Sequence, residues 1–118
     1  MSNIVHESWG EERTIDSSDK YVVKKYFIKA GRRLFKHFHT KKQKTIYVLK
    51  GTLHIDLSDA PGDSNILKIY EGNHWRILPK TIHRFTAQEE QGVEFFEIST
   101  PELNDVFYLD TNHGGENA

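Results

Sequence analysis

The chain has 118 residues, which fits one domain and leaves no room for a second. It contains no cysteine, which excludes disulfides, thiolate metal sites and cysteine nucleophiles. Its 16 Lys and Arg against 17 Asp and Glu give a formal net charge of −1, so bulk electrostatics predicts no nucleic-acid binding. No apolar run reaches about 18 residues, and the start of the chain lacks the basic and apolar regions of a signal peptide. We therefore expect a soluble cytoplasmic protein without membrane contact.

Short runs rich in β-branched and aromatic residues recur along the chain and predict strands. In chain order they are residues 21–29, 45–49, 53–57, 66–70, 75–78 and 93–98. Turn residues separate them, at 30–31, 50–51, 60–63, 71–73 and 91–92. No segment sustains an apolar period of helical spacing, so the pattern predicts an all-β antiparallel sandwich or barrel.

The ends of the chain differ from this central part. Residues 1–18 are polar and residues 111–118 have nothing to bury, so we expect an N-terminal extension, a barrel over 19–110 and a loose C-terminal tail. Within the barrel, alternation places Ile46 and Val48 on one face of a strand and Tyr47 on the other. Because both faces are apolar, we expect that strand to be covered on both sides.

Three histidines indicate a functional site. His37 and His39 are two residues apart, so on a strand their imidazoles share a face, about 7 Å apart, within chelating reach of one ion. His83, four residues after Pro79, is the third candidate. A pair of histidines with this spacing also occurs on exposed strands that bind nothing, so the pair alone does not identify a metal site.

The surrounding sequence resembles the two cupin motifs. Gly31, five intervening residues and then His37-x-His39 resemble the start of the first motif, and residues 72–83 resemble the second, glycine–x5–P–x–G–x2–H. The resemblance implies a single-domain cupin, a double-stranded β-helix or jelly-roll β-barrel. It also implies that His37, His39 and His83 bind a divalent transition metal: Zn, Fe, Mn, Co or Ni.

The sequence departs from both motifs at defined positions. Lys44 stands where cupins have a metal-binding glutamate, while Leu78 and Lys80 replace the proline and glycine of the second motif. An ammonium 4 Å from a cation is repelled by about 4 kcal/mol at intermediate dielectric. Lys44 must therefore turn away, lose its proton, or mark a site without metal. Burial near the metal would lower its pKa and make it a general base, but we expect rather a lysine that pairs with a nearby acid. A bulge beside it would turn the carbonyl of Gln43 toward the metal as a further ligand.

A longer set of matches is similar to the mannose-6-phosphate isomerase type II group. The matching stretches are residues 8–10, 20–24, 31–34, 47–51, 82–85, 97–101 and 105–110. This similarity implies aldose–ketose isomerisation of a sugar phosphate at a metal. Arg84, Arg76 and Lys80 are the candidates to hold the anionic group, with a solvated surface charge as the alternative for each. Tyr108 replaces the arginine of the group's usual C-terminal ending.

Several functions are compatible with this sequence, and not all of them are enzymatic. Besides a metal-dependent sugar-phosphate isomerase, the chain fits a metal-free deoxysugar-nucleotide ketoisomerase, a group that it resembles over residues 37–42. It also fits a three-histidine cupin oxygenase and a non-catalytic sugar-binding module. We also expect a homodimer, in which residues 21–27 pair or exchange between copies because small cupins have exposed sheet edges.

Overall fold

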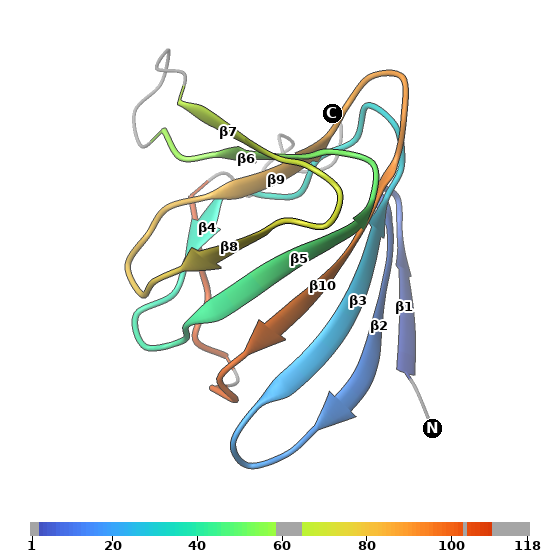
Figure 1. Ribbon diagram of the computed structural model, residues 1–118. Helices are drawn as coiled ribbons and strands as arrows, with labels where there is room; N and C mark the ends of the chain where they lie inside the picture. The colour runs from blue at the N-terminus through green and yellow to red at the C-terminus, as the bar shows by residue number, and fades with distance from the viewer. Residues whose placement is uncertain (1–2, 59–64, 103, 110–118) are drawn as a thin grey trace.

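The structure is a computed structural model that describes residues 3–58, 65–102 and 104–109, and these residues form eleven strands and no helix (Figure 1). The larger sheet is antiparallel. In spatial order its strands are β1 (Asn3–Glu7), β2 (Gly10–Ser17), β3 (Val22–Ile28), β10 (Val93–Ser99), β5 (Lys44–Lys50) and β8 (His74–Ile77). In the described part of the chain, no helix is long and apolar enough to cross a membrane.

A second sheet faces the first. Its strands are β7 (Ile66–Ile69), β6 (Leu53–Asp56) and β9 (Arg84–Ala87). A two-stranded pair, β4 (His37–Phe38) with β11 (Phe107–Tyr108), continues this wall, because bridges at Arg33–Thr86 and His37–His83 connect its segment to β9. The all-β sandwich or barrel expected from the sequence is confirmed.

The core lies between the two sheets. Ile46, Val48 and Phe95 from the larger sheet pack with Ile55 and Phe85 from the smaller one, and none of these side chains is more than 1% exposed. The rings of Phe85 and Phe95 meet edge-on with centroids 5.3 Å apart. The strands predicted from β-branched and aromatic runs correspond to β3, β5, β6, β7, β8 and β10.

The outer face of β5 is open, contrary to expectation. Tyr47 is 40% exposed, whereas its neighbours Ile46 and Val48 are fully buried. An aromatic side chain on a strand is therefore not sufficient evidence for a covering layer, since exposed apolar side chains are common on folded proteins.

The expectation that residues 1–18 lie outside the barrel as a loose extension is also wrong for residues 3–17. These residues form β1 and β2, and β2 pairs with β3 in a register that runs from Gly10↔Ile28 to Ser17↔Val22. Backbone pairing with a tertiary neighbour does not require an apolar sequence, which explains why local composition missed it. The predicted C-terminal tail, 111–118, lies outside the described residues.

The strand expected to exchange between copies is a central one. Residues 22–28 form β3, which is hydrogen-bonded to β2 on one side and β10 on the other, so its backbone groups are already paired. The strand at this end of the sheet is β1, and all of its residues are exposed. The homodimer itself stays a prediction, and edge pairing at this end of the sheet would have to use β1.

Candidate metal centre

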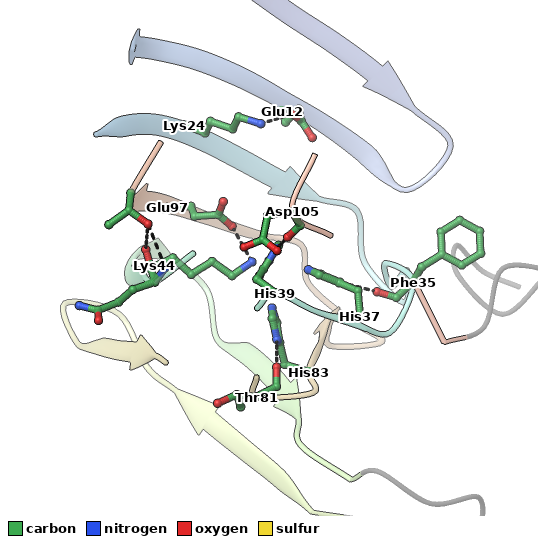
Figure 2. A network of polar contacts seen from close by, with 12 residues as sticks. Glu12, Lys24, Phe35, His37, His39, Lys44, Thr81, His83, Glu97 and Asp105 are labelled. Carbon is green, nitrogen blue, oxygen red and sulfur yellow. Dashed lines mark hydrogen bonds and ion pairs between the residues drawn. The ribbon is translucent and has the colours of Figure 1, made fainter. Parts of the chain in front are cut away.

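The three predicted histidines come together inside the barrel. His37 lies on β4, and His39 follows that strand by one residue. His83 directly precedes β9, and its backbone exchanges two hydrogen bonds, of 2.9 and 3.0 Å, with His37. One ligand atom of each imidazole lies within 4.8 Å of the others, and all three residues are buried (Figure 2).

Each imidazole is held at Nδ1 by a backbone carbonyl. The acceptors for His37, His39 and His83 are the carbonyls of Phe35 at 3.0 Å, Asp105 at 2.5 Å and Thr81 at 2.9 Å. A carbonyl only accepts, so each Nδ1 carries the proton and donates it, and each Nε2 keeps its lone pair. This arrangement is typical of histidines that bind a metal through Nε2.

The electrostatic environment keeps the imidazoles neutral. Burial and then the Lys44 ammonium lower the pKa of His37 to about 3, and the same two causes lower the pKa of His39 and of His83. Among the described residues, Nε2 of His39 and Nε2 of His83 are buried without a hydrogen-bond partner. Buried acceptors without partners are costly, and a cation among the three Nε2 atoms would satisfy them. The residues present therefore fit a divalent metal.

A buried ion pair stands on the opposite wall. Lys44 Nζ lies 3.3 Å from Glu97 Oε1, and the two side chains are 3% and 7% exposed. Lys44 Nζ also lies 5.0 Å from the centroid of the Phe85 ring. Burial lowers the pKa of Lys44, and Glu97 opposes this. Burial disfavours the Glu97 carboxylate, but Lys44 and Lys24 outweigh burial and lower its pKa.

The Lys44–Glu97 pair explains how a lysine is accommodated at the position where the first cupin motif has a glutamate. Lys44 does not turn away from the interior, and Figure 2 shows its side chain extending toward the histidines. Its charge is compensated by Glu97, which reduces the repulsion that an isolated ammonium would exert on a cation. Sequence reasoning missed Glu97. The available signal was its position on the inward face of residues 93–99, where it alternates with Val93 and Phe95.

The site opens into a cavity of about 500 Å³. Its lining is aromatic and charged, and includes Trp9, Tyr26, Phe35, Tyr108, Glu12, Lys24, Lys42, Lys44, Glu97, His37 and His39. Glu12 and Lys24 form a second ion pair of 3.0 Å toward the outside, with side chains 23% and 30% exposed. The Glu12–Lys24 pair therefore lies nearer the opening of the cavity, and the Lys44–Glu97 pair lies deeper, beside the histidines.

Two predicted site residues lie elsewhere. Gln43 is exposed and precedes β5, and its backbone N–H and carbonyl are bonded to Thr100, so it does not join the histidine cluster. Arg84 does not line the cavity, and the charged groups that act on it are Arg33 and Asp56. Regular alternation on β9 directs Arg84 to the face opposite that of its neighbours in the chain.

The departure at Lys80 has a structural consequence. Lys80 adopts φ 70°, in the left-handed region where the cupin motif has glycine. Its backbone N–H donates to the carbonyl of His39, 2.5 Å away. The turn before His83 thus has the left-handed conformation of the motif's glycine, although the residue is lysine. The turn is also hydrogen-bonded to the backbone of His39.

Comparisons with known proteins identify the family and the fold of the chain. The family model described as mannose-6-phosphate isomerase C-terminal matches residues 1–109. Among curated proteins, no sequence matches the chain. The solved oxalate decarboxylase from Bacillus subtilis at pH 4.6 is similar with a TM-score of 0.77 and 23% identity, over 92% of this chain and 30% of that one.

Two further solved structures have the same fold. The oxalate decarboxylase of Lactobacillus farciminis, in a formate complex, has a TM-score of 0.76 and 24% identity, over 92% of this chain and 34% of that one. An uncharacterized conserved protein from Klebsiella pneumoniae with a double-stranded β-helix domain has a TM-score of 0.70 and 14% identity, over 92% and 85% of the two chains. The chain thus spans about a third of the decarboxylases.

Proposed function

Because the chain belongs to the mannose-6-phosphate isomerase C-terminal family, we propose that it binds a divalent metal and interconverts the aldose and ketose forms of a sugar phosphate. The observation that carries this proposal is the set of three buried, neutral imidazoles beside the Lys44–Glu97 pair. His37, His39 and His83 would hold the metal. When bound, a divalent ion supplies Lewis-acid polarisation of a substrate oxygen.

The proton transfers fall to the buried pair. Aldose–ketose interconversion moves one proton between adjacent carbons and one between their oxygens. Glu97 takes the proton from the carbon beside the carbonyl and returns it to the former carbonyl carbon. Lys44 Nζ delivers a proton to the carbonyl oxygen and takes one back from the neighbouring hydroxyl, so both side chains end as they began. Lys44 is thus still proposed as a catalytic residue, but it transfers protons at the oxygens, and Glu97 replaces it as the base at carbon.

The cavity suits a sugar phosphate. Its volume of about 500 Å³ lies within the usual range for small-molecule sites. Trp9, Tyr26 and Tyr108 supply aromatic surface for the apolar face of a sugar. Lys42 and Lys24 line the same cavity and provide cations for a phosphate, in place of the Arg84 that was expected.

The metal-free ketoisomerase is the alternative that the geometry disfavours. In that reaction two histidines shuttle protons, which requires an imidazole that accepts a proton near neutral pH. Burial and Lys44 hold the pKa of His37 at about 3, far below that range. A neutral imidazole of this kind is better suited to binding a metal than to carrying a proton.

The test is an isomerase assay in D₂O with mannose 6-phosphate or fructose 6-phosphate and added Zn, Mn, Co or Ni. NMR follows both interconversion and deuterium uptake at the reacting carbons. We expect activity with at least one metal, and a loss of about 100- to 10,000-fold in Glu97→Gln, the usual range for a general base. Glu94→Gln is the matched control, because Glu94 lies on the same strand with its carboxylate paired to Lys25, 3.5 Å away.

The outcomes separate the candidate functions. Absence of interconversion and of deuterium uptake with every metal would contradict the isomerase for this substrate pair. Interconversion that persists after chelation and dialysis would contradict the requirement for a metal in the proposed reaction. Equal activity of Glu97→Gln and Glu94→Gln would remove Glu97 from the chemistry while leaving the metal site intact.

A further inference from the structure

The segment that contains β11 lies against the segment that carries His37 and His39. Residues 104–109 run beside residues 36–42, and β11 pairs with β4 in the register Phe107↔Phe38 and Tyr108↔His37. The Leu109 N–H donates to the Lys36 carbonyl at 2.9 Å. A part of the chain far away in sequence therefore contacts two of the metal ligands.

Within this segment, the Asp105 carboxylate holds three successive backbone N–H groups. Oδ1 accepts from the Thr40 N–H at 3.0 Å and from the Thr40 hydroxyl at 2.6 Å. Oδ2 accepts from the Lys41 N–H at 2.7 Å and from the Lys42 N–H at 2.8 Å. Consecutive N–H groups that converge on one anion form a concavity that fixes the local backbone.

The backbone of Asp105 contacts the ligand that precedes this loop. Its carbonyl accepts the Nδ1–H of His39 at 2.5 Å, although the two residues are 66 positions apart (Figure 2). The partners of the other imidazoles are local, since Phe35 and Thr81 each lie two residues before the histidine they hold. Only for His39, among the three, does ring orientation depend on a distant segment.

We propose that Asp105 is the positioning residue of the metal centre: its carboxylate clamps the backbone of Thr40, Lys41 and Lys42, and this clamp holds its carbonyl against His39. The inference rests on the proposed metal site and deepens it. The same hydrogen bonds fix the backbone of Lys42, a residue that lines the cavity. The hydrogen bonds from Thr40, Lys41 and Lys42 also hold the pKa of the Asp105 carboxyl well below its usual range, so the clamp stays charged.

The experiment compares Asp105→Asn with Asp16→Asn. An amide at position 105 removes the negative charge and keeps only one acceptor oxygen, while its NH2 group faces backbone N–H groups that need an acceptor. Asp16 is exposed and bonded to Ser17 and Tyr21, remote from the histidines, so the matched substitution there controls for loss of a carboxylate. The readouts are the dissociation constant for Zn²⁺, by chelator competition, and the visible spectrum of the Co²⁺-loaded protein, which reports ligand geometry.

We expect Asp105→Asn to weaken Zn²⁺ binding about 10- to 100-fold and to change the Co²⁺ spectrum, as is usual when the partner of a ligating histidine is disturbed. Asp16→Asn should leave both unchanged. Thr40→Val, which removes only the hydroxyl contact, should weaken Zn²⁺ binding by a smaller factor, and it provides the test if Asp105→Asn does not fold. Zn²⁺ affinity and Co²⁺ spectra equal to those of the parent in the folded variants would overturn the proposal.

If the parent protein binds neither Zn²⁺ nor Co²⁺, the proposed function fails. The clamp is then tested through the Nδ1 proton of His39. Long-range ¹H–¹⁵N NMR should find the His39 proton on Nδ1 in the parent, with slow exchange, and faster exchange in Asp105→Asn. A proton on Nε2, or unchanged exchange in Asp105→Asn, would contradict the clamp independently of any metal.

Discussion

The two walls of the barrel interior place buried polar groups in different ways. On one wall, His37, His39 and His83 are neutral, and each is oriented by a backbone carbonyl. On the other, Lys44 and Glu97 are both charged, and each depends on the other for compensation. Backbone carbonyls thus orient the three imidazoles, whereas Lys44 and Glu97, on adjacent strands, hold each other in place through their side chains.

This difference indicates how the two walls divide the work. Backbone carbonyls cannot move away without breaking the fold, so the imidazoles are held ready for a ligand that binds at Nε2. A side-chain pair can exchange protons and partners when a substrate enters, while the fold stays unchanged.

The largest expected effect comes from leaving one member of the buried pair alone. Glu97→Gln strands the Lys44 ammonium in the interior, and we expect the free energy of unfolding in urea to fall by about 3 to 5 kcal/mol. Replacing both residues, as Lys44→Met with Glu97→Met, should recover most of that loss because no charge then stays buried. If the double variant is as unstable as Glu97→Gln, the two residues are not coupled as described.

The low pKa of the buried histidines predicts that the stability of the fold depends on pH. The folded-state pKa of His37, about 3, lies below its ordinary value of 6.5, so the unfolded chain binds the extra proton and stability is lost as pH falls. Between pH 6.5 and 4.5 the titration of His37 alone should cost up to about 1.4 kcal/mol per pH unit. Urea unfolding in the presence of a chelator measures this, and His37→Gln should show a smaller slope. An equal slope in both proteins would mean that His37 is protonated in the fold.

A smaller effect is expected at Lys80, whose backbone bonds His39. Lys80→Gly removes the strain of a left-handed lysine, and we expect the midpoint of thermal unfolding to rise, in line with a gain of up to about 1 kcal/mol. Lys80→Ala is the control, because alanine retains the strain. A glycine variant that is less stable than the alanine variant would contradict the assignment of strain to this residue.

The smallest effect is expected at the outer ion pair. Glu12 and Lys24 are partly exposed, so solvent screens their interaction, and Glu12→Gln should lower the free energy of unfolding by less than about 1 kcal/mol. The cost should fall further in high salt. A loss as large as that of Glu97→Gln would mean that burial does not separate the two pairs.

The sequence predicted those features that depend on local pattern. The strands β3, β5, β6, β7, β8 and β10 follow from β-branched and aromatic runs, and the three-histidine cluster follows from motif spacing. Glu97 and Asp105 escaped prediction because their partners are set by long-range register and by the return of residues 104–109 to β4. The same reason applies to β1 and β2, whose polar sequence becomes sheet through pairing with β3.

We infer that His37, His39 and His83 hold a metal, and elemental analysis of protein purified without chelator shows whether they do. We predict about one divalent transition metal per chain in the parent and none in His37→Ala/His39→Ala, because the double variant keeps only one of the three ligands. His6→Ala/His74→Ala serves as the matched control, since both histidines are exposed and lie outside the cluster, and it should retain the metal. A parent protein without metal that also fails to take up Zn, Mn, Co, Ni or Fe on dialysis would contradict the claim.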